Sequence, residues 1–303
     1  MIQTFEDVDR LAAERGPKRL AVLAPEDEEF MSAVKQCWQR GLVTPVLIGN
    51  RDVMAAIADR VGFDLSDIEQ ITMEDRQAIA DLGTAMLFAG DVDMESKGQI
   101  PTSYIYRSII REESKAKTGR TVSVISLWDV PGAKHFIALT DTGVNIQPDY
   151  TAKKEIIKNA VFLFHILGYK RPRIGIISAR RSLNRFPDSY RDALALKEAA
   201  DSGDFGACDI VDATSLFDFF MNHTDSVTHD DGINIDCLPE ILLVPNLDTG
   251  NILVKLDFFL DVKRRSLVTT SKGPAIIPSR SDFCNAIVGE LALGIVVADR
   301  MMH

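Results

Sequence analysis

The chain has 303 residues, of which 46% are hydrophobic and 26% are charged, and its formal net charge is −10. A chain of this length and apolar content buries a large core in one or two domains, which excludes disordered and fibrous classes. The excess of 44 acidic over 34 basic residues also excludes a general nucleic-acid binder, which needs cations to displace phosphate counterions. A small anionic substrate in a locally basic site remains compatible with this charge.

Short apolar runs of strand length alternate with segments of helical period along the whole chain. In chain order, strands are expected at 19–24, 45–48, 85–89, 121–129, 135–140, 173–178, 240–244, 266–269 and 275–277. Helices are expected at 28–40, from about 102, and at 151–167, 189–200, 250–260 and 282–298. The strands near 121–129 and 135–140 are candidates for a hairpin through Pro131-Gly132.

Continuous apolar strands such as ILLV (241–244) and GIIS (175–178) favour sheets covered by helices on both faces, which is typical of an α/β fold. We predict two domains with a boundary near 147–149. The first domain is expected at 1–147 plus about 283–303, because the last helix returns to it, and the second at 148–282.

The spacing of the cysteines and histidines and the apolar segments of the chain argue against a metal site, secretion and membrane insertion. The four cysteines form no CxxC pair, and the five histidines show no metal-ligand spacing, so we expect no metal site. The first residues, MIQTFEDVDR, lack the pattern of a signal peptide, and the apolar runs at 161–167 and 286–298 are too short or carry Glu290. We expect a soluble cytoplasmic protein with reduced thiols and with neither membrane nor nucleic acid as a partner.

The segment Pro278–Asp282 (PSRSD) follows an apolar run and precedes the last expected helix. A strand that ends at a helix N-terminus offers backbone N–H groups to an anion, and Arg280 adds a guanidinium fork suited to phosphate. Ser279 can donate to a carbonyl or to a nucleophile. The alternative is that Ser281 or Asp282 caps the helix and Arg280 lies in water, and the spacing does not separate the two interpretations.

Lys97-Gly98, with Thr102 and Arg107, forms a second candidate. Gly98 permits close backbone approach, Thr102 is a candidate helix cap, and Arg107 follows about a turn and a half later. Taken alone, these residues fit an ordinary loop and helix start with a surface arginine, and that interpretation is favoured.

Polar residues also follow other expected strands, where α/β sheets place their ligands. The motifs are TDxxxNxxP, with Asp141 and Asn145, and PNxxxGN, with Asn246, Gly250 and Asn251. Turn and cap chemistry explains such residues equally, and it is favoured for Asp141 and Asn145.

Arg180, Arg181 and Arg185 follow the expected strand at 173–178 and are candidates to receive phosphates, although a solvated loop face is the favoured interpretation. Each of these signals is weak alone. Their shared position past the ends of strands indicates a cleft.

Taken together and in order, these segments resemble the phosphate acetyl/butyryltransferase family, and the butyryl branch more closely. The similarity extends from Leu20 nearly to the C-terminus, and the succession of TDxxxNxxP, PNxxxGN and PSRSD is specific to the family. The resemblance implies two three-layer α/β/α domains with a cleft between them, isocitrate-dehydrogenase-like, in a homodimer or higher homo-oligomer. It also implies reversible transfer of a short-chain acyl group between coenzyme A and inorganic phosphate through an acyl phosphate, with no metal and no cofactor besides coenzyme A as substrate.

The resemblance assigns roles to residues as well. Ser279 and Arg280 would hold the acyl phosphate and the attacking sulfur, with Asp282 as candidate base, although a capping role fits Asp282 equally. The expected chemistry is direct attack of the coenzyme A thiolate in a ternary complex, without an enzyme nucleophile. The expected substrate- and coenzyme A-binding residues are Lys97, Gly98, Thr102, Arg107, Asp141, Asn145, Asn246 and Asn251.

The chain also departs from the family pattern. No histidine follows Ser123, where the family usually has a Ser-His pair, Ala213-Thr214 replaces a Gly-Pro loop, Ser96 replaces a methionine and Glu240 an aspartate. These departures motivate an alternative function, namely a catalytically degenerate member that binds acyl-CoA or a phosphate ligand without turnover.

Overall fold

The computed structural model describes residues 1–179, 187–212, 214–221, 235–279 and 281–302. The chain forms two compact α/β units. The first unit consists of Phe5–Val122 and Arg265–His303, and the second of Met1–Thr4 and Ser123–Arg264. The candidate residues Arg180, Arg181, Arg185, Ala213 and Arg280 lie outside the described residues.

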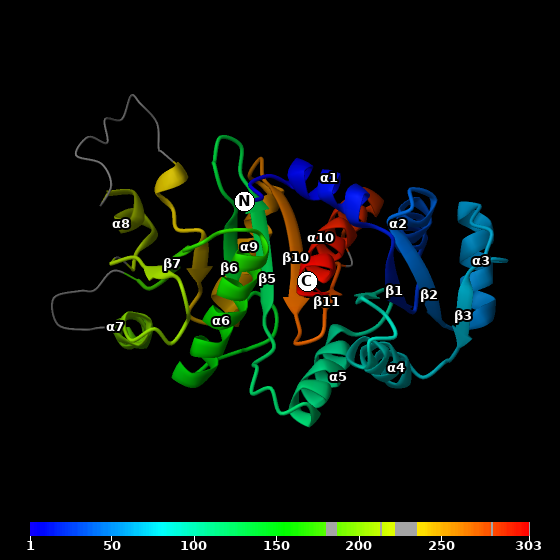
Figure 1. Cartoon of the computed structure of the whole chain (residues 1–303), viewed down its shortest axis with the longest axis horizontal. Helices are drawn as coiled ribbons and strands as arrows, with labels where there is room; N and C mark the ends of the chain where they lie inside the picture. Colours follow the sequence, from blue (N-terminus) through cyan, green and yellow to red (C-terminus); the bar gives the residue numbers. More distant parts are fainter. Residues whose placement is uncertain (180–186, 213, 222–234, 280, 303) are drawn as a thin grey trace. The chain divides into compact units, whose positions relative to one another are not determined.

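The sheet of the first unit has the strand order β3-β2-β1-β4-β11-β10 (Figure 1). All neighbouring strands are parallel except β10, which pairs antiparallel with β11. The bounds are β1 (Lys18–Leu23), β2 (Val43–Gly49), β3 (Glu69–Thr72), β4 (Met94–Lys97), β10 (Lys263–Thr269) and β11 (Pro274–Ile276).

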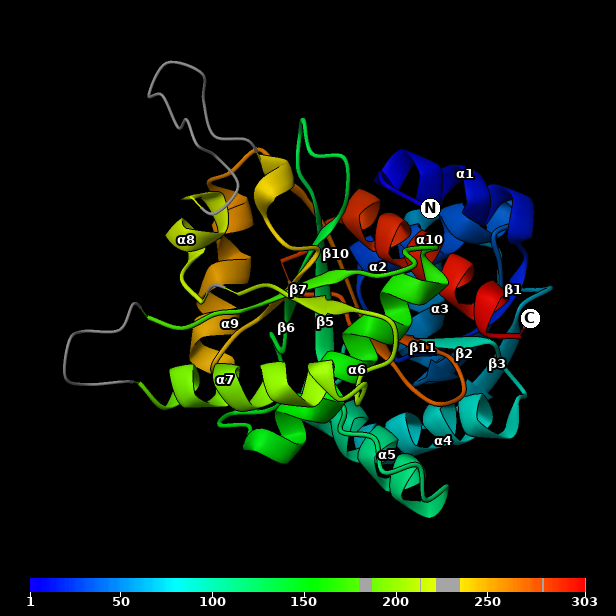
Figure 2. The same cartoon turned by 60° about the vertical axis from the view of Figure 1, so that its left-hand side comes forward.

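Helices cover both faces of this sheet. Figures 1 and 2 show α4 (Arg76–Ala89) and α5 (Thr102–Lys115) on one face. The opposite face carries α1 (Phe5–Arg15), α2 (Glu28–Gln39), α3 (Arg51–Val61) and α10 (Cys284–Met302). The helix starts follow local chemistry, because Asp27, Asn50 and Asp75 cap α2, α3 and α4 by accepting backbone N–H groups.

The strand predicted at 85–89 is wrong, because these residues form the last turns of α4. The buried residues of α4 are Ile79, Ala80, Gly83, Thr84 and Leu87, which share one face at helical spacing. The apolar run AMLFA resembles a strand when it is considered alone, without the preceding turns of the helix.

The sheet of the second unit has the order β5-β6-β9-β7-β8. The predicted hairpin is confirmed, since β5 (Val124–Asp129) and β6 (Ile137–Thr140) pair antiparallel. The other pairs are parallel and involve β7 (Arg173–Ile176), β8 (Asp209–Ile210) and β9 (Ile241–Leu243).

In the second unit, α6 (Tyr150–Ile166) and α7 (Asp188–Asp201) lie on one face, and α8 (Leu216–Met221) and α9 (Leu247–Val254) on the other (Figure 2). Short 3₁₀ turns follow at η1 (Ile235–Cys237) and η2 (Lys255–Phe258). Apolar residues of the strands and of α8 and α9, including Leu139, Phe219, Leu242 and Val254, form a buried cluster on the second face. The α/β class predicted from the sequence is therefore confirmed.

The units change at residues 4/5, 122/123 and 264/265, whereas the predicted domain boundaries lie at 147/148 and 282/283. The last two changes each lie beside a hairpin. The hairpin β5–β6 pairs with β9 of the second unit, and the hairpin β10–β11 pairs with β4 of the first. Among the described residues, every helix falls short of the length and hydropathy needed to cross a bilayer.

Candidate active site

Four of the predicted residues, Lys97, Gly98, Ser279 and Asp282, line one small cavity of the first unit, with a volume of about 20 Å³. Lys97 ends β4, whereas Ser279 and Asp282 lie between β11 and α10. Because β4 and β11 pair in parallel, the segments that follow them meet at the carboxyl edge of the sheet. The other described residues of the wall are Asp27, Phe30, Gln99, Pro278 and Ile287.

Lys97 places a charged group in this cavity wall. The residue is only 5% exposed, and its Nζ donates to the carbonyl oxygens of Gly98 at 3.3 Å and Pro278 at 3.5 Å. The ammonium therefore places a positive charge in the cavity wall, where it would attract a negative charge on a bound molecule.

Gly98 is required by the backbone around it. Its N–H donates to the Leu23 carbonyl and that of Gln99 to the Ala24 carbonyl, both at 2.8 Å. A Cβ at Gly98 would lie 2.2 Å from the Ala24 carbonyl oxygen. Gly98 therefore allows the backbone after β4 to lie close to the backbone at the end of β1.

The segment from Ser279 to Asp282 forms a closed turn before α10. The Ser279 N–H donates to Oδ2 of Asp282 at 2.7 Å, and the Asp282 N–H donates to the Ser279 carbonyl at 3.0 Å. The hydroxyls of Ser279 and Ser281 lie 3.0 Å apart. Asp282 therefore stabilises this turn, and its role as a base stays a prediction.

Two residues that form no sequence motif shape the same cavity. The Asp27 carboxylate caps α2 by accepting the Phe30 N–H at 2.8 Å, and its other oxygen accepts from Gln99 Nε2 at 2.6 Å. The cap connects the start of α2 to the loop after β4. The sequence around Asp27 can predict a helix cap. It cannot predict the hydrogen bond from Gln99, which depends on the pairing of β1 with β4.

Thr102 and Arg107 belong to α5, and neither is among the described residues of the cavity wall. The prediction that Thr102 caps this helix is wrong, because Pro101 occupies the N-cap position without a side-chain hydrogen bond. Arg107 donates to Oε1 of Gln77 in α4 at 3.0 Å and lies 5.5 Å from the Tyr104 ring centre.

Asp141 is a hydrogen-bonding centre for its own loop. It is 2% exposed, and Oδ1 accepts the N–H groups of Val124 and Gly143, both at 2.9 Å. Oδ2 accepts from the backbone N–H of Asn145 at 2.7 Å and from its side-chain Nδ2 at 2.6 Å. This geometry agrees with the turn interpretation of both residues.

The second asparagine motif packs against that loop. Asn246 caps α9 by accepting the N–H and the hydroxyl of Thr249, at 3.0 and 2.9 Å. Asn251 donates to a carbonyl of the Asp141 loop at 3.5 Å. A Cβ at Gly250 would lie 2.4 Å from the Asp141 carbonyl oxygen. The two motifs therefore specify one junction of the fold.

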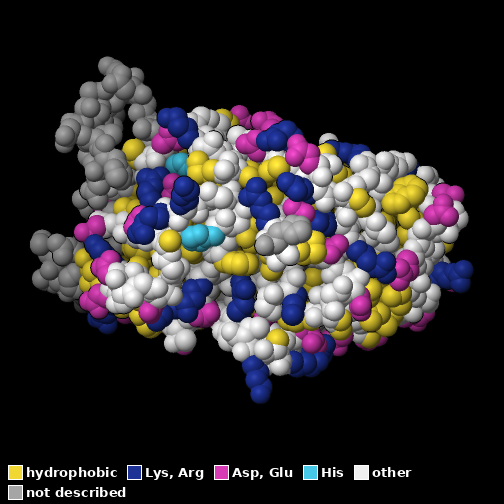
Figure 3. Space-filling view, viewed as in Figure 1, with side chains coloured by type: hydrophobic (Ala, Val, Ile, Leu, Met, Phe, Trp, Pro, Cys, Tyr) yellow, Lys and Arg dark blue, Asp and Glu magenta, His cyan; other side chains and the backbone are white. Residues whose placement is uncertain are grey.

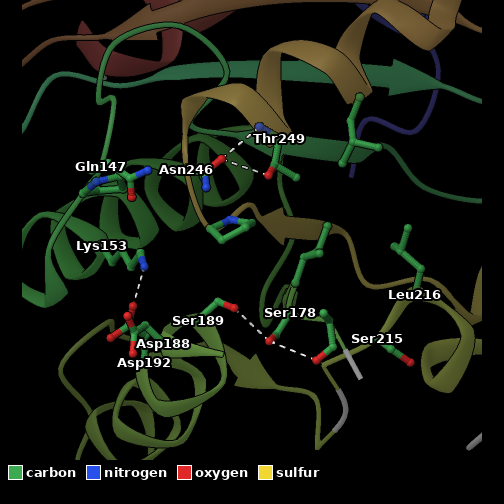
Figure 4. A pocket seen from close by; sticks show the side chains of 15 residues that line it. Gln147, Lys153, Ser178, Asp188, Ser189, Asp192, Ser215, Leu216, Asn246 and Thr249 are labelled. Carbon is green, nitrogen blue, oxygen red and sulfur yellow. Dashed lines mark hydrogen bonds and ion pairs between the residues drawn. The ribbon is translucent and has the colours of Figure 1, made fainter. Parts of the chain in front are cut away.

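A larger hollow, of about 770 Å³, lies in the second unit past the ends of β7 and β9 (Figure 4). Asn246 is on its wall. Lys153 of α6 pairs there with Asp192 of α7, and the hydroxyls of Ser178 and Ser189 lie 2.9 Å apart. Of the predicted binding residues, Asn246 lies on this wall; no local motif marks an ion pair between residues 39 positions apart.

Three titratable groups of the first unit have raised pKa values. Glu95, two residues before Lys97, is fully buried, and burial raises its pKa to about 8 although the Thr84 hydroxyl donates to its Oε2 at 3.0 Å. Burial also raises the pKa of Cys37 to about 12 and shifts the pKa of Cys284 upward. These two thiols are therefore poor nucleophiles.

Three further observations concern metal ligands, surface charge and Ser123. The described residues contain no group of three or more His, Cys, Asp or Glu that could hold a metal ion. On the face shown in Figure 3, basic and acidic side chains are intermixed. Ser123 is buried, and its hydroxyl accepts from Asn159 Nδ2 at 2.9 Å.

Comparison with known proteins identifies relatives of this chain. A family model described as Phosphate acetyl/butaryl transferase matches residues 77–258. The phosphate butyryltransferase of Clostridium acetobutylicum is 27% identical over 98% of this chain and 99% of its own length. The phosphate acetyltransferase of Rhizobium meliloti is 27% identical over 96% of this chain and 93% of its own.

Solved structures share the fold. A branched-chain phosphotransacylase from Enterococcus faecalis V583 superposes with a TM-score of 0.74 at 20% identity, covering 95% of this chain and all of its own. A phosphotransacetylase from Streptococcus pyogenes superposes with a TM-score of 0.76 at 16% identity, covering 99% of both chains.

Proposed function

We propose that this chain, which belongs to the phosphate acetyl/butyryl transferase family, transfers a short acyl group between coenzyme A and inorganic phosphate. The family resemblance stated from the sequence is confirmed, and the protein is an enzyme of the phosphate acyltransferase class. The observation that carries the proposed reaction is the cavity where Lys97 meets Pro278 and Ser279, from segments 181 positions apart.

The proposed chemistry is direct acyl transfer. The coenzyme A thiol gives its proton to a base, for which Asp282 is the candidate, and the sulfur attacks the carbonyl carbon of the acyl phosphate. The carbon–oxygen bond to phosphate then breaks and phosphate leaves, and the reverse reaction uses the same steps. We assign the charge on the carbonyl oxygen to Lys97 and the phosphate to Ser279 and Arg280, since one such donor is typically worth about 3–4 kcal/mol.

The raised pKa values of Cys37 and Cys284 support attack by the substrate thiol rather than by an enzyme thiol. The proposal needs no cofactor, because coenzyme A is itself a substrate. We also propose a homodimer, for which the exposed side chains of Phe258, Phe259 and Leu260 offer an apolar surface. Light scattering on the purified protein tests that assembly.

Of the other predicted binding residues, Gly98 and Asn246 line cavities, whereas Asp141, Asn145 and Asn251 hydrogen-bond within one loop junction. We therefore propose that those three act on the substrate only through the shape of the loops. Arg107 and Thr102 stay candidates for coenzyme A.

Asp282 has two possible roles, and one substitution separates them. Asp282→Asn keeps an oxygen that accepts the Ser279 N–H but removes the base. If Asp282 takes the thiol proton, the kcat of the variant falls at least about a hundredfold, and the acid limb due to Asp282 disappears from the pH profile of kcat. If Asp282 only closes the turn, the variant retains nearly the activity of the wild type.

The reaction itself is tested by incubating a panel of acetyl-, propionyl- and butyryl-CoA with phosphate and measuring free thiol. Release that depends on phosphate and is lost in Lys97→Met and Arg280→Ala supports the proposal. Arg171→Ala, on an exposed side chain of the second unit, is the control for the loss of a positive charge. Absence of thiol release with every acyl-CoA refutes the proposed reaction, and calorimetric binding of acyl-CoA in that case identifies a degenerate binding protein.

A further inference from the structure

The Asp27 carboxylate joins two segments of the first unit that are distant in the sequence. Its Oδ1 accepts the Phe30 N–H at the start of α2, and its Oδ2 accepts from Gln99 Nε2 at 2.6 Å, 72 positions away. A helix cap needs only the first of these contacts. Asp75, for example, caps α4 by accepting one N–H at 2.6 Å and has no second side-chain partner among the described residues. Capping therefore does not explain the hydrogen bond from Gln99.

The backbone around Gln99 is held to the same segment. The Gly98 N–H donates to the Leu23 carbonyl and the Gln99 N–H to the Ala24 carbonyl, both at 2.8 Å. Ala24 has a φ of +49°, a left-handed conformation that is unfavourable for a residue with a Cβ and persists only where the surroundings fix it. Residues 23–27 and 98–99 therefore form one junction, which the hydrogen bond between Gln99 and Asp27 closes.

This junction helps to place the Lys97 ammonium. Lys97 Nζ donates to the carbonyl oxygen of Gly98 at 3.3 Å, and the same oxygen accepts the Ile100 N–H at 2.9 Å. Because one acceptor of the ammonium belongs to the junction, a shift of residues 98–99 displaces the charge. A misplacement of about 1 Å can lower the rate of an enzyme about 10²-fold.

We propose that Asp27 and Gln99 are positioning residues for Lys97 and that they act on the reaction only through it. The inference rests on the proposed function, in which Lys97 stabilises the charge that develops on the carbonyl oxygen. Neither residue belongs to the sequence motifs, and neither gives or takes a proton. Their loss lowers kcat and leaves KM nearly unchanged, because the stabilised charge appears only in the transition state.

The test removes the hydrogen bond and then restores it. Gln99→Met removes the donor, and Gln99→Glu places a carboxylate opposite the Asp27 carboxylate, so each should lower kcat with acyl-CoA about tenfold. In the double variant Asp27→Asn/Gln99→Glu, the asparagine oxygen keeps the cap and its amide donates to the new carboxylate, so kcat should return to within about threefold of the wild type. Gln70→Met and Gln70→Glu are the matched controls, on an exposed glutamine of β3 whose Nε2 donates to the Leu65 carbonyl at 3.2 Å.

A double-mutant cycle shows whether the effect passes through Lys97. In the Lys97→Met background, Gln99→Met should lower kcat no further. A full tenfold loss in that background overturns the inference. So do losses in the Gln99 variants no larger than in the Gln70 variants, a failure of Asp27→Asn to restore Gln99→Glu, or a change confined to KM.

Hydrogen–deuterium exchange of the Gly98 and Gln99 amides provides a second readout that does not need activity. Both amides should exchange at least about tenfold faster in Gln99→Met than in the wild type, and at nearly the wild-type rate in the double variant. If the wild type turns over no acyl-CoA, the proposed function fails, and the exchange rates still decide whether Asp27 and Gln99 hold the loop that carries Lys97. Unchanged exchange in Gln99→Met then overturns the inference as well.

Discussion

Replacing Glu95 by Gln should change how the stability of the protein depends on pH. The carboxyl is fully buried in β4, and burial raises its pKa from 4.5 to about 8. Between these values the native state holds a proton that the unfolded state releases, so the free energy of unfolding falls as pH rises. The contribution is complete below the unfolded pKa and is lost as pH passes through the folded pKa.

One pKa unit corresponds to about 1.4 kcal/mol, so an interval of about 3.5 units limits the loss in the wild type to about 5 kcal/mol. Glu95→Gln keeps an oxygen that accepts from the Thr84 hydroxyl but has no proton to release. Its buried amide lacks a charge at every pH, and an unpaired amide donor costs about 1–3 kcal/mol. Near pH 5 the variant should therefore be no more stable than the wild type. Between pH 5 and pH 8.5, the difference in free energy of unfolding between the two proteins should shift by several kcal/mol in favour of the variant.

The measurement is urea unfolding of both proteins, followed by circular dichroism, at intervals from pH 5 to pH 8.5. Contributions from all other titrating groups cancel in the difference between the two proteins. Glu14→Gln, on a side chain 53% exposed in α1, is the control for the loss of an acidic residue. A difference between Glu95→Gln and wild type that stays constant across this range would refute the reasoning.

Three other substitutions test the loop junction and the cavity. Gly250→Ala should lower the free energy of unfolding by roughly 2–4 kcal/mol, because its Cβ would lie 2.4 Å from the Asp141 carbonyl oxygen, and an unchanged melting temperature would contradict this. Asp141→Asn should cost roughly 2–4 kcal/mol in chemical denaturation, since it loses charge-assisted hydrogen bonds from buried N–H groups; full stability with lost activity would instead indicate a direct role. Lys97→Met should lower kcat about 10²–10³-fold at nearly constant melting temperature, and wild-type kinetics would remove Lys97 from the chemistry.

Much of the fold was predictable because its signals are local. The strand at 173–178 and the helix at 28–40 agree with β7 and α2 to within about two residues, since a short apolar run and the period of a helix are each visible over a few positions. The prediction of a strand at 85–89 is wrong because the helical period of the buried residues becomes visible only when the preceding turns of α4 are included. Two of the changes between units lie beside hairpins. The strands with which these hairpins pair are distant in the sequence, so no local pattern predicts the pairing.

The candidate site was predictable only in its motif residues. Lys97 and Ser279 were candidates from the residues around them, the family resemblance assigned them roles, and the parallel pairing of β4 with β11 explains why they share a cavity. Phe30 occupies one position of the apolar face of the helix at 28–40, a pattern that predicts its burial but not the cavity that it lines. The ion pair of Lys153 with Asp192 joins two helices, and neither helix alone predicts it.

The motif residues carry different kinds of information about function. Asp141 and Gly250 satisfy the backbone of one loop junction, so a chain that had lost catalysis would still need them to fold. Lys97 differs, because burying an ammonium costs desolvation free energy that an apolar side chain in the same place would avoid. Its Nζ donates to the carbonyl oxygens of Gly98 and Pro278, which offsets part of that cost. A lysine at 5% exposure beside Ser279 is therefore the residue of this cavity whose substitution best separates a role in function from a role in folding.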